Sequence, residues 1–206
     1  MELFKKRIEP GMTVVDVGAH VGLYSLVGST LVGSTGKVYA FEPEPSNYNL
    51  LLKNMKANGL INIVPVRKAV SDKSGATMLF VNPKASTGHT ITAHRELMKS
   101  ISCEMTSLDE SLSGQRVDFV KIDVEGAEIA VLRGMRRVIS ENPRIQLLCE
   151  FAPDLLSEAE VEPRDLLEQL AAYGFTIYKL DSRRREMVRI IDLFQLSSCY
   201  LFCTRE

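Results

Sequence analysis

The amino-acid sequence predicts an α/β fold, in which a mostly parallel β-sheet is covered by helices on both faces. Two observations lead to this prediction. Short apolar runs typical of buried strands alternate along the 206-residue chain with longer segments of helical periodicity. The first apolar run also ends in a glycine-containing turn, "DVGAHVG" at residues 16–22, which leads into a helix. Strand, turn and helix in this order are typical of the βαβ units that build parallel sheets.

Seven runs are expected to be strands, because each is short, apolar and bounded by polar or turn-forming residues. In chain order they are Thr13–Val17, Lys37–Glu42, Ile63–Lys68, Val117–Asp123, Ile145–Phe151, Phe175–Asp181 and Ser197–Thr204. The segments between them that are expected to be helices are Leu23–Leu31, Pro45–Asn58, Ala127–Glu141 and Pro163–Tyr173. A short, charged segment joins the last two strands, which predicts an antiparallel pair at one end of the sheet.

Chain length and composition predict a single domain spanning residues 1–206. A second core would leave each half near the lower limit of stable domain size. Hydrophobic residues make up 45% of the chain and charged residues 25%, as in an ordinary globular protein. The polar stretch Asn82–Leu97 interrupts the alternation of strands and helices. It is expected to belong to a functional insertion at about residues 82–106, because long polar insertions in compact domains often carry function.

Charge and cysteine content exclude several kinds of partner and site. The net charge of -1 gives no electrostatic footprint for a nucleic acid or an anionic membrane surface. The opening segment "MELFKKRIEPGM" has charges where a signal peptide has apolar residues, and no run is long enough to cross a bilayer, so a cytoplasmic protein is expected. The four scattered cysteines do not fit a disulfide framework or a zinc site, and free thiols are expected at Cys103, Cys149, Cys199 and Cys203.

The turn after the first strand is expected to bind a ligand, because doubly wound sheets hold ligands at the carboxyl ends of their strands. Gly18 and Gly22 allow a tight turn and a close approach of the backbone to a ligand. Asp16 ends the first strand, and Glu42 ends the second, where a carboxylate can accept hydrogen bonds from both hydroxyls of a ribose. The N–H groups at the start of the following helix suit a negative group.

The spacing of the glycines separates two kinds of ligand. A dinucleotide motif G-x-G-x-x-G that starts at Gly18 needs glycines where this chain has His20 and Leu23. An acid before the first glycine is also unfavourable beside a pyrophosphate, whereas it suits a ligand with an ammonium group. S-adenosylmethionine is such a ligand: its ribose suits Glu42, its amino group and sulfonium suit Asp16, and its carboxylate suits the N–H groups of the turn.

A second group of acidic residues follows the predicted strand Val117–Asp123. Asp123 and Glu125 are two positions apart and point to the same side if the strand continues. Glu150 ends the next strand, which should be a neighbour. A carboxylate or histidine beside an acceptor can remove its proton, and the candidates for this role are Asp123, Glu125, Glu150 and His89 of the insertion. Capping of the next helix is the alternative role for Asp123 and Glu125.

Four segments, taken together, resemble the FkbM-type S-adenosylmethionine-dependent methyltransferases. They are "DVGAHVGLYSL", "AFEPEPSNYNLL", "SLDESL" and "VDFVKIDVEGAEIAVLRG", in this order over roughly residues 10–180. The resemblance implies a class I methyltransferase fold, a Rossmann-like three-layer sandwich with seven strands in the order 3-2-1-4-5-7-6 and strand 7 antiparallel. It also implies O-methylation of a hydroxyl on a sugar, glycan or other small natural-product-like acceptor, with S-adenosylhomocysteine as the product. His20 departs from the asparagine common in the family's loop.

The residues expected to bind the cofactor lie at the ends of the first four strands and in the first loop: Asp16, Gly18, Ala19, His20, Gly22, Glu42, Pro43, Ala69, Val70 and Asp123. The resemblance places the adenine near Ala69 and Val70. No metal ligand is predicted, although a divalent cation would suit a carboxylate pair. The expected partner is a small-molecule or glycan acceptor. Because few residues precede the first strand, the acceptor pocket is expected to be open or completed by another chain, and a homodimer is one of the open oligomeric states.

Two other functions remain open at this point. One is a catalytically silent module that binds an adenosyl ligand and works through protein contacts; the acids at both strand ends count against it. The other is an NAD-dependent Rossmann enzyme, against which the missing glycines count. A nucleic-acid methyltransferase of the amino-group type would carry N/D-P-P-Y/F after the fourth strand, where this chain has "DVEG".

Overall fold

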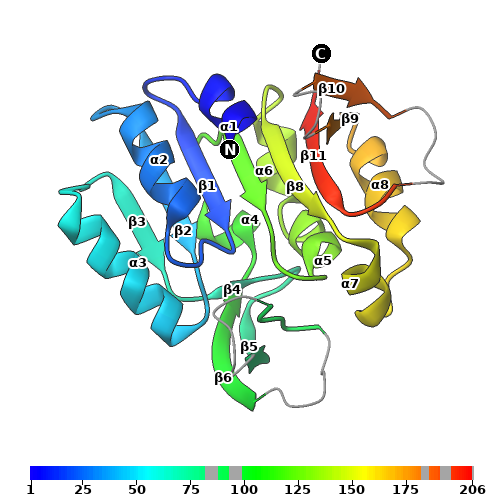
Figure 1. Ribbon diagram of the computed structural model, residues 1–206, viewed down its shortest axis with the longest axis horizontal. Coiled ribbons are helices and arrows are strands. Elements are labelled where there is room, and N and C mark those ends of the chain that lie inside the picture. Colours follow the sequence, from blue (N-terminus) through cyan, green and yellow to red (C-terminus); the bar gives the residue numbers. More distant parts are fainter. Residues whose placement is uncertain (82–87, 93–98, 182–185, 191–195, 206) are drawn as a thin grey trace.

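The computed structural model describes residues 1–81, 88–92, 99–181, 186–190 and 196–205. Its centre is an eight-stranded sheet in the order β10-β9-β11-β8-β7-β1-β2-β3 (Figure 1). The bounds of these strands are β1 Thr13–Val17, β2 Lys37–Phe41, β3 Ile63–Val66, β7 Phe119–Ile122, β8 Gln146–Phe151, β9 Thr176–Asp181, β10 Glu186–Arg189 and β11 Cys199–Thr204. Without β10, the seven remaining strands have the predicted order, and β11 is antiparallel to both neighbours. The predicted fold class is therefore confirmed.

The last strands differ in detail from the prediction. The segment expected only to join β9 to β11 contains β10, which pairs with β9 and forms the edge of the sheet. The final strand β11 lies between β8 and β9 and pairs with both. Because β11 runs antiparallel to β8, its first residues lie at the sheet edge where β8 ends, and Tyr200 is the register partner of Glu150.

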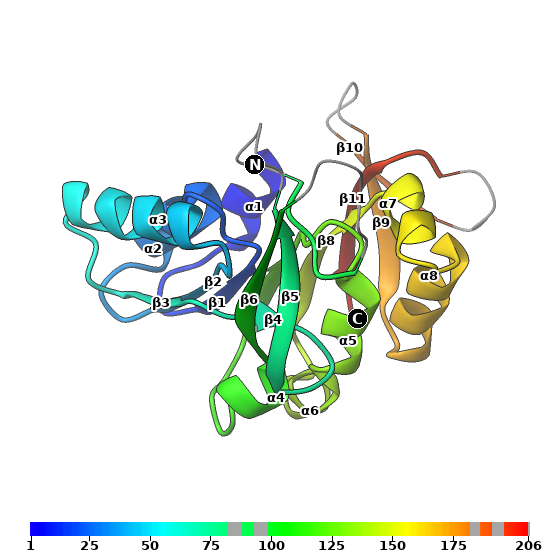
Figure 2. The same ribbon diagram turned by 90° about the horizontal axis from the view of Figure 1, so that it is seen from below.

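Helices cover both faces of the sheet (Figure 2). The helices α1 (Glu2–Arg7), α2 (Leu23–Val32) and α3 (Pro45–Ala57) lie on one face, and α5 (Glu128–Arg133), α6 (Arg136–Glu141) and α8 (Pro163–Ala172) lie on the other. Successive strand residues face opposite layers, so Val14 packs with Phe4 of α1 while Val15 packs with Leu132 of α5. Among the described residues, no helix combines the length and the apolar character that a membrane span needs.

The predicted helix Ala127–Glu141 is two short helices, α5 and α6, which are separated at Gly134 and Met135. Gly134 lies against the backbone of Ser71, where an added Cβ would come within 2.0 Å of the Ser71 carbonyl oxygen. Its own carbonyl accepts a hydrogen bond from the backbone N–H of Asp109 instead of continuing a helix. The break therefore results from tertiary contacts between distant segments.

A second, three-stranded sheet lies beyond the carboxyl ends of the parallel strands (Figures 1 and 2). Its order is β4-β6-β5, with β4 at Ala69–Val70, β5 at Gly75–Val81 and β6 at Lys99–Thr106. Strand β6 lies inside the predicted insertion, whose residues 82–87 and 93–98 are outside the described part of the chain. Residues 88–92 return to β5, since Phe80 and Thr90 form a β-bridge. Two short helices, α4 (Leu108–Ser111) and α7 (Pro153–Glu158), complete the described elements.

Candidate functional site

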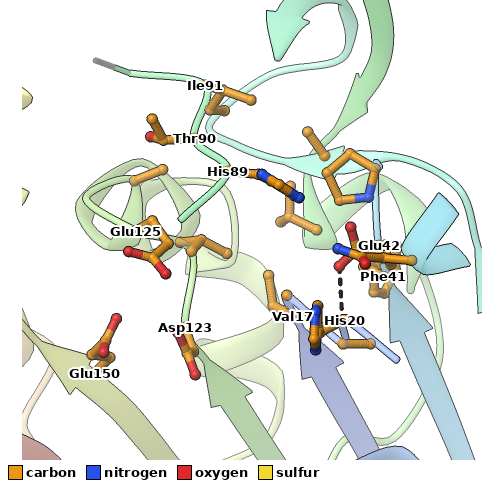
Figure 3. A pocket seen from close by; sticks show the side chains of 18 of the residues that line it. Val17, His20, Phe41, Glu42, His89, Thr90, Ile91, Asp123, Glu125 and Glu150 are labelled. Carbon is orange, nitrogen blue, oxygen red and sulfur yellow. Dashed lines mark hydrogen bonds between the residues drawn. The ribbon is translucent and has the colours of Figure 1, made fainter. Parts of the chain in front are cut away.

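A cavity of about 380 Å³ lies at the carboxyl ends of β1, β2, β7 and β8 (Figure 3). The loop after β1, the end of β2 and strand β4 line one end of it. The acidic residues that follow β7 and end β8 line the other end, and residues 88–91 lie above. Of the predicted site residues, the cavity is lined by Gly18, Ala19, His20, Glu42, Pro43, Ala69, Val70, His89, Asp123, Glu125 and Glu150. Asp16 and Gly22 are not among its lining residues.

The two glycines let the first loop lie flat against its neighbours. Gly18 has φ +76°, and a Cβ there would come within 1.9 Å of the carbonyl oxygen of Asp123. Gly22 has φ +97°, and a Cβ there would meet side chains of α2 and α3 at 2.5 Å. The backbone N–H groups of Gly18 and Ala19 both donate to the carbonyl of Phe41, at 3.0 and 2.9 Å. Glycine is therefore required at position 18 to bring the loop against the end of β7.

Glu42 is buried at the end of β2, with 5% of its surface exposed, and lines the cavity. Its Oε2 accepts a hydrogen bond from the backbone N–H of His20 at 2.8 Å, and its Oε1 accepts one from the N–H of Glu44 at 2.9 Å (Figure 3). Burial raises the pKa of Glu42 to about 7 in spite of these two donors. Each oxygen keeps a second lone pair, so the carboxylate can also accept hydrogen bonds from a ligand's hydroxyl groups.

His20 also lines this end of the cavity, and its backbone is in the left-handed region, which is strained for a residue other than glycine. Its φ is +53°, and its N–H bond to Glu42 holds that conformation. Its Nε2 atom is buried and has no hydrogen-bond partner within the described part of the protein.

Asp16 lies below the loop and not in the cavity, and its side chain is 1% exposed. Its Oδ2 accepts a hydrogen bond from the Ser25 hydroxyl at 2.6 Å, and its Oδ1 lies 3.4 Å from Nζ of Lys121. Lys121 is 3% exposed and donates to the carbonyl of Gly18 at 2.8 Å. Asp16 therefore contacts Lys121, which lines the cavity, but does not line the cavity itself. Its direct contact with a cofactor stays a prediction that this geometry does not support.

Lys121 and Tyr200 line the cavity but are not among the residues predicted from the sequence. Lys121 could have been found from the strand "FVKI", since a lysine in a strand buried on both faces needs partners of opposite charge. Its side chain lies on the same face as Phe119, which packs below α1, because alternate strand residues share a face. Nothing in the sequence marks Tyr200 as a site residue, because tyrosine is common in strands.

Asp123 and Glu150 lie side by side at the acidic end, as the expected pairing of their strands predicts. The Tyr200 hydroxyl donates to Oδ2 of Asp123 at 2.7 Å, and Nζ of Lys121 lies 3.4 Å from the same oxygen. Oε2 of Glu150 is buried and has no hydrogen-bond partner among the described residues. The two carboxyl groups therefore have different surroundings. A cation and a hydroxyl hold Asp123, whereas Glu150 is hydrogen-bonded to Asp123 itself and forms no ion pair with a cation in the part of the chain that the structure describes.

This difference separates their pKa values. Burial by itself would raise the pKa of Asp123, but the Lys121 ammonium and the Tyr200 hydroxyl together lower it. Burial raises the pKa of Glu150 to about 8, and repulsion by Asp123 adds to this shift. At neutral pH the pair therefore holds one proton, mainly on Glu150, and Asp123 carries the charge.

Glu125 does not share a continuing strand with Asp123, which corrects the expectation. Strand β7 ends at Ile122, and Glu125 lies in a tight turn with φ +55°. Its Oε1 accepts a hydrogen bond from the N–H of Gly88 at 3.2 Å, so it ties the predicted insertion to this turn. The buried carboxylate of Glu128 stabilises the turn, because it accepts hydrogen bonds from the backbone N–H groups of Val124 and Gly126.

The described part of the insertion brings His89 to the cavity, between the two groups of acidic residues (Figure 3). Burial lowers the pKa of His89, which favours the neutral imidazole. His94, the other histidine of the insertion, lies outside the described residues. Within the part of the chain that the structure describes, no three His, Cys, Asp or Glu side chains are arranged to hold a metal ion.

Curated relatives are methyltransferases. Hexuronic acid methyltransferase AglP of Haloferax volcanii is 31% identical over 142 residues, which cover 68% of this chain and 56% of AglP. Methyltransferase sdnD of Sordaria araneosa is 26% identical over 155 residues, with 59% of this chain and 60% of sdnD covered. The chain thus spans less than two thirds of the length of these relatives.

Solved structures share the fold. Methyltransferase FkbM from Methylobacillus flagellatus superposes with a TM-score of 0.60 at 16% identity, covering 98% of this chain and 50% of that chain. Fibrillarin of Aeropyrum pernix, solved with natively bound S-adenosyl-L-methionine, gives 0.55 at 15% identity, covering 96% and 68%. A family model of the methyltransferase FkbM domain matches residues 16–177. The resemblance found in the sequence is confirmed: the chain belongs to the FkbM methyltransferase family.

Proposed function

We propose that this chain binds S-adenosylmethionine in the cavity and transfers its methyl group to a hydroxyl of a sugar, glycan or other small natural-product-like acceptor. Family membership supports the reaction class. The observation that carries the proposal is the division of one cavity into two ends. Glu42 lies at one end as an acceptor for ribose hydroxyls, and Glu150 lies at the other as a carboxyl group whose raised pKa suits it to take a proton.

The residues at the first end fit S-adenosylmethionine. Glu42 can accept hydrogen bonds from both ribose hydroxyls, and His20 lines the same end of the cavity. The nearby buried group of Asp16, Lys121 and Asp123 contains two carboxylates and one ammonium, so its net charge is negative and suits a cationic ligand. When bound, S-adenosylmethionine supplies a methyl group made electrophilic by the sulfonium.

The residues at the second end position an acceptor hydroxyl and take its proton. As the acceptor oxygen bonds to the methyl carbon, its proton passes to the ionised Glu150 carboxylate and the electron pair of the carbon–sulfur bond stays on sulfur. Asp123, held by Lys121 and Tyr200, can accept a hydrogen bond from a neighbouring hydroxyl of the acceptor and so orient it. A base of this kind contributes about 10²–10⁴-fold, and correct positioning contributes the rest.

The charge at this end favours a neutral hydroxyl over a carboxylate as the acceptor group. Asp123, Glu125 and Glu150 all line it. Lys121 is the cation nearest to Asp123 among the described residues, and four oxygen atoms already surround it. A carboxylate acceptor would therefore meet like charges. We therefore propose a neutral hydroxyl, and not the carboxylate of a hexuronic acid, as the acceptor group, since AglP is matched over only 56% of its length.

The test is an incubation with S-adenosylmethionine labelled in its methyl group and a matched panel of acceptors. The panel pairs neutral glycosides with the corresponding uronic acids and adds glycans and small hydroxylated metabolites, with products identified by mass spectrometry. O-methylated neutral members are expected, with transfer abolished or strongly reduced in Glu150→Gln and kept in the surface control Glu9→Gln. Methyl esters of the uronic acids as the main product would refute the acceptor assignment. Binding of S-adenosylhomocysteine without transfer to any panel member would favour the silent module.

A further inference from the structure

Lys121 occupies an unusual position for a lysine, because it is buried between the two ends of the cavity. It lies in the middle of β7, in register with Asp16 on β1. Its Nζ donates to the carbonyl oxygen of Gly18 at 2.8 Å and lies 3.4 Å from the carbonyl oxygen of Val17. It also lies 3.4 Å from a carboxylate oxygen of Asp16 and 3.4 Å from one of Asp123. Four oxygen atoms from the ends of two strands therefore surround one ammonium group.

At the loop, Lys121 fixes the direction of the peptide group after Gly18. The next N–H, that of Ala19, donates to Phe41 of β2 at 2.9 Å. The same peptide unit is thus bonded on the β2 side through its N–H and on the β7 side through its carbonyl. Loss of the ammonium would leave two buried carbonyl oxygens without this donor, and the loop would be free to turn away from the position that lines the cavity.

At the acidic end, Lys121 supplies the positive charge beside Asp123. The titratable groups facing the carboxyl pair come from α2, β7, the turn after β7, α5, β8 and β11; they are Tyr24, Lys121, Glu125, Glu128, Cys149 and Tyr200. Within this set Lys121 is the group that is positively charged at neutral pH. It therefore favours the arrangement in which Asp123 is ionised and the proton of the pair is on Glu150.

We propose that Lys121 is a positioning residue that joins the two ends of the site: it holds the glycine loop in the shape that binds the cofactor and keeps Asp123 charged beside Glu150. The inference rests on the proposed function, because it assigns the loop to S-adenosylmethionine and the carboxyl pair to the acceptor. Its two halves are measured separately, one by ligand binding and one by titration of the carboxyl pair, and neither measurement needs the acceptor.

The first measurement is the affinity for S-adenosylhomocysteine by isothermal titration calorimetry. Lys121→Met is compared with Lys53→Met, which removes an exposed lysine of α3. Lys121→Met is expected to bind at least about tenfold more weakly, since a buried hydrogen-bond donor to the loop is lost. Lys53→Met is expected to bind as the wild type does. Unchanged affinity in folded Lys121→Met would overturn the loop half of the proposal.

The second measurement is the titration of Glu150 by NMR in protein labelled with ¹³C at glutamate side-chain carboxyls, with the resonance assigned by its loss in Glu150→Gln. The wild-type midpoint is expected near pH 8, the pKa that burial and Asp123 give this group. In Lys121→Met the midpoint is expected to rise by about one unit or more, because loss of the cation disfavours two negative charges side by side. A purely structural lysine would leave the midpoint unchanged, and that result would overturn the second half.

A double variant covers the case in which Lys121→Met does not fold. Asp16→Asn with Lys121→Met removes a charge of each sign and keeps the hydrogen-bond acceptor of Ser25. The same weakened binding and raised midpoint are expected, since neither the loop carbonyls nor Asp123 regain a partner. If the wild-type protein binds no S-adenosylhomocysteine, the proposed function and the loop half of the inference are refuted together. If the wild type binds it and both variants bind and titrate as the wild type does, only the role proposed for Lys121 is refuted.

Discussion

Gly18→Ala should destabilise the protein far more than a similar substitution at a glycine of similar conformation. Gly18 has φ +76°, which costs an alanine about 1–2 kcal/mol by itself. Its added Cβ would also lie 1.9 Å from the Asp123 carbonyl oxygen. To reach ordinary contact that carbonyl must move by roughly 1.5 Å, which strains the hydrogen bond from Asp123 N–H to Val17. Overpacking of this kind adds about 1–3 kcal/mol, so the total loss is about 2–5 kcal/mol.

Gly174→Ala is the matched control. Gly174 has φ +80°, and a Cβ there would meet no atom within 4 Å. Gly174→Ala therefore measures only the cost of placing an alanine in this backbone conformation, about 1–2 kcal/mol. Urea denaturation followed by circular dichroism gives both free energies of unfolding, and calorimetry with S-adenosylhomocysteine reports on the loop. Equal losses of stability in the two variants would show that the close approach of the loop to β7 is not present, and the account of the site would fail with it.

The other predictions concern the two ends of the cavity. Glu42→Ala should weaken S-adenosylhomocysteine binding by about 1–3 kcal/mol in calorimetry. In the wild type, affinity should rise with pH around 7, because the pKa of Glu42 is raised to about 7 and the ionised form accepts the ribose hydroxyls better; Glu42→Ala should lose this dependence. Methyl transfer should rise roughly tenfold between pH 7 and 9 as Glu150 loses its proton, and a flat profile would exclude Glu150 as the base. Asp123→Asn should keep the affinity for S-adenosylhomocysteine, which has no sulfonium charge, and lower turnover by about 10²-fold or more; full turnover would remove Asp123 from the acceptor site.

The arrangement of the central sheet could be predicted because its strands are apolar and its connections follow βαβ rules. Thr13–Val17 is found with the predicted bounds, and the predicted strand order is present. The small sheet could not be predicted in the same way. Half of the residues of strand β6, "KSISCEMT", are exposed and most are polar, so its sequence carries little of the hydrophobic signal that marks a buried strand. The break between α5 and α6 at Gly134 depends on contact with the backbone of Ser71, and the sequence around Gly134 gives no sign of that contact.

The candidate site could be predicted where topology alone decides the neighbours. Asp123 and Glu150 were expected to be adjacent because consecutive parallel strands end at one edge, and they are adjacent. The position of Asp16 shows the limit of this reasoning. A residue at the end of a strand faces either the ligand or the layer below, and the alternation of β1 turns Asp16 toward Ser25 of α2.

Residue type does not distinguish the roles of two neighbouring carboxylates, whereas their surroundings do. From the sequence, Asp123 and Glu150 are equivalent candidates for a base. In the structure Asp123 lies beside an ammonium and accepts from Tyr200, and both interactions stabilise its charge and make it a weak proton acceptor. Glu150 is largely buried beside that charge, so it holds a proton more tightly and is the stronger base once ionised. If the pair acts in this way, the residue that decides which carboxylate takes the acceptor's proton is neither of them but Lys121, two positions before Asp123 on the same strand face.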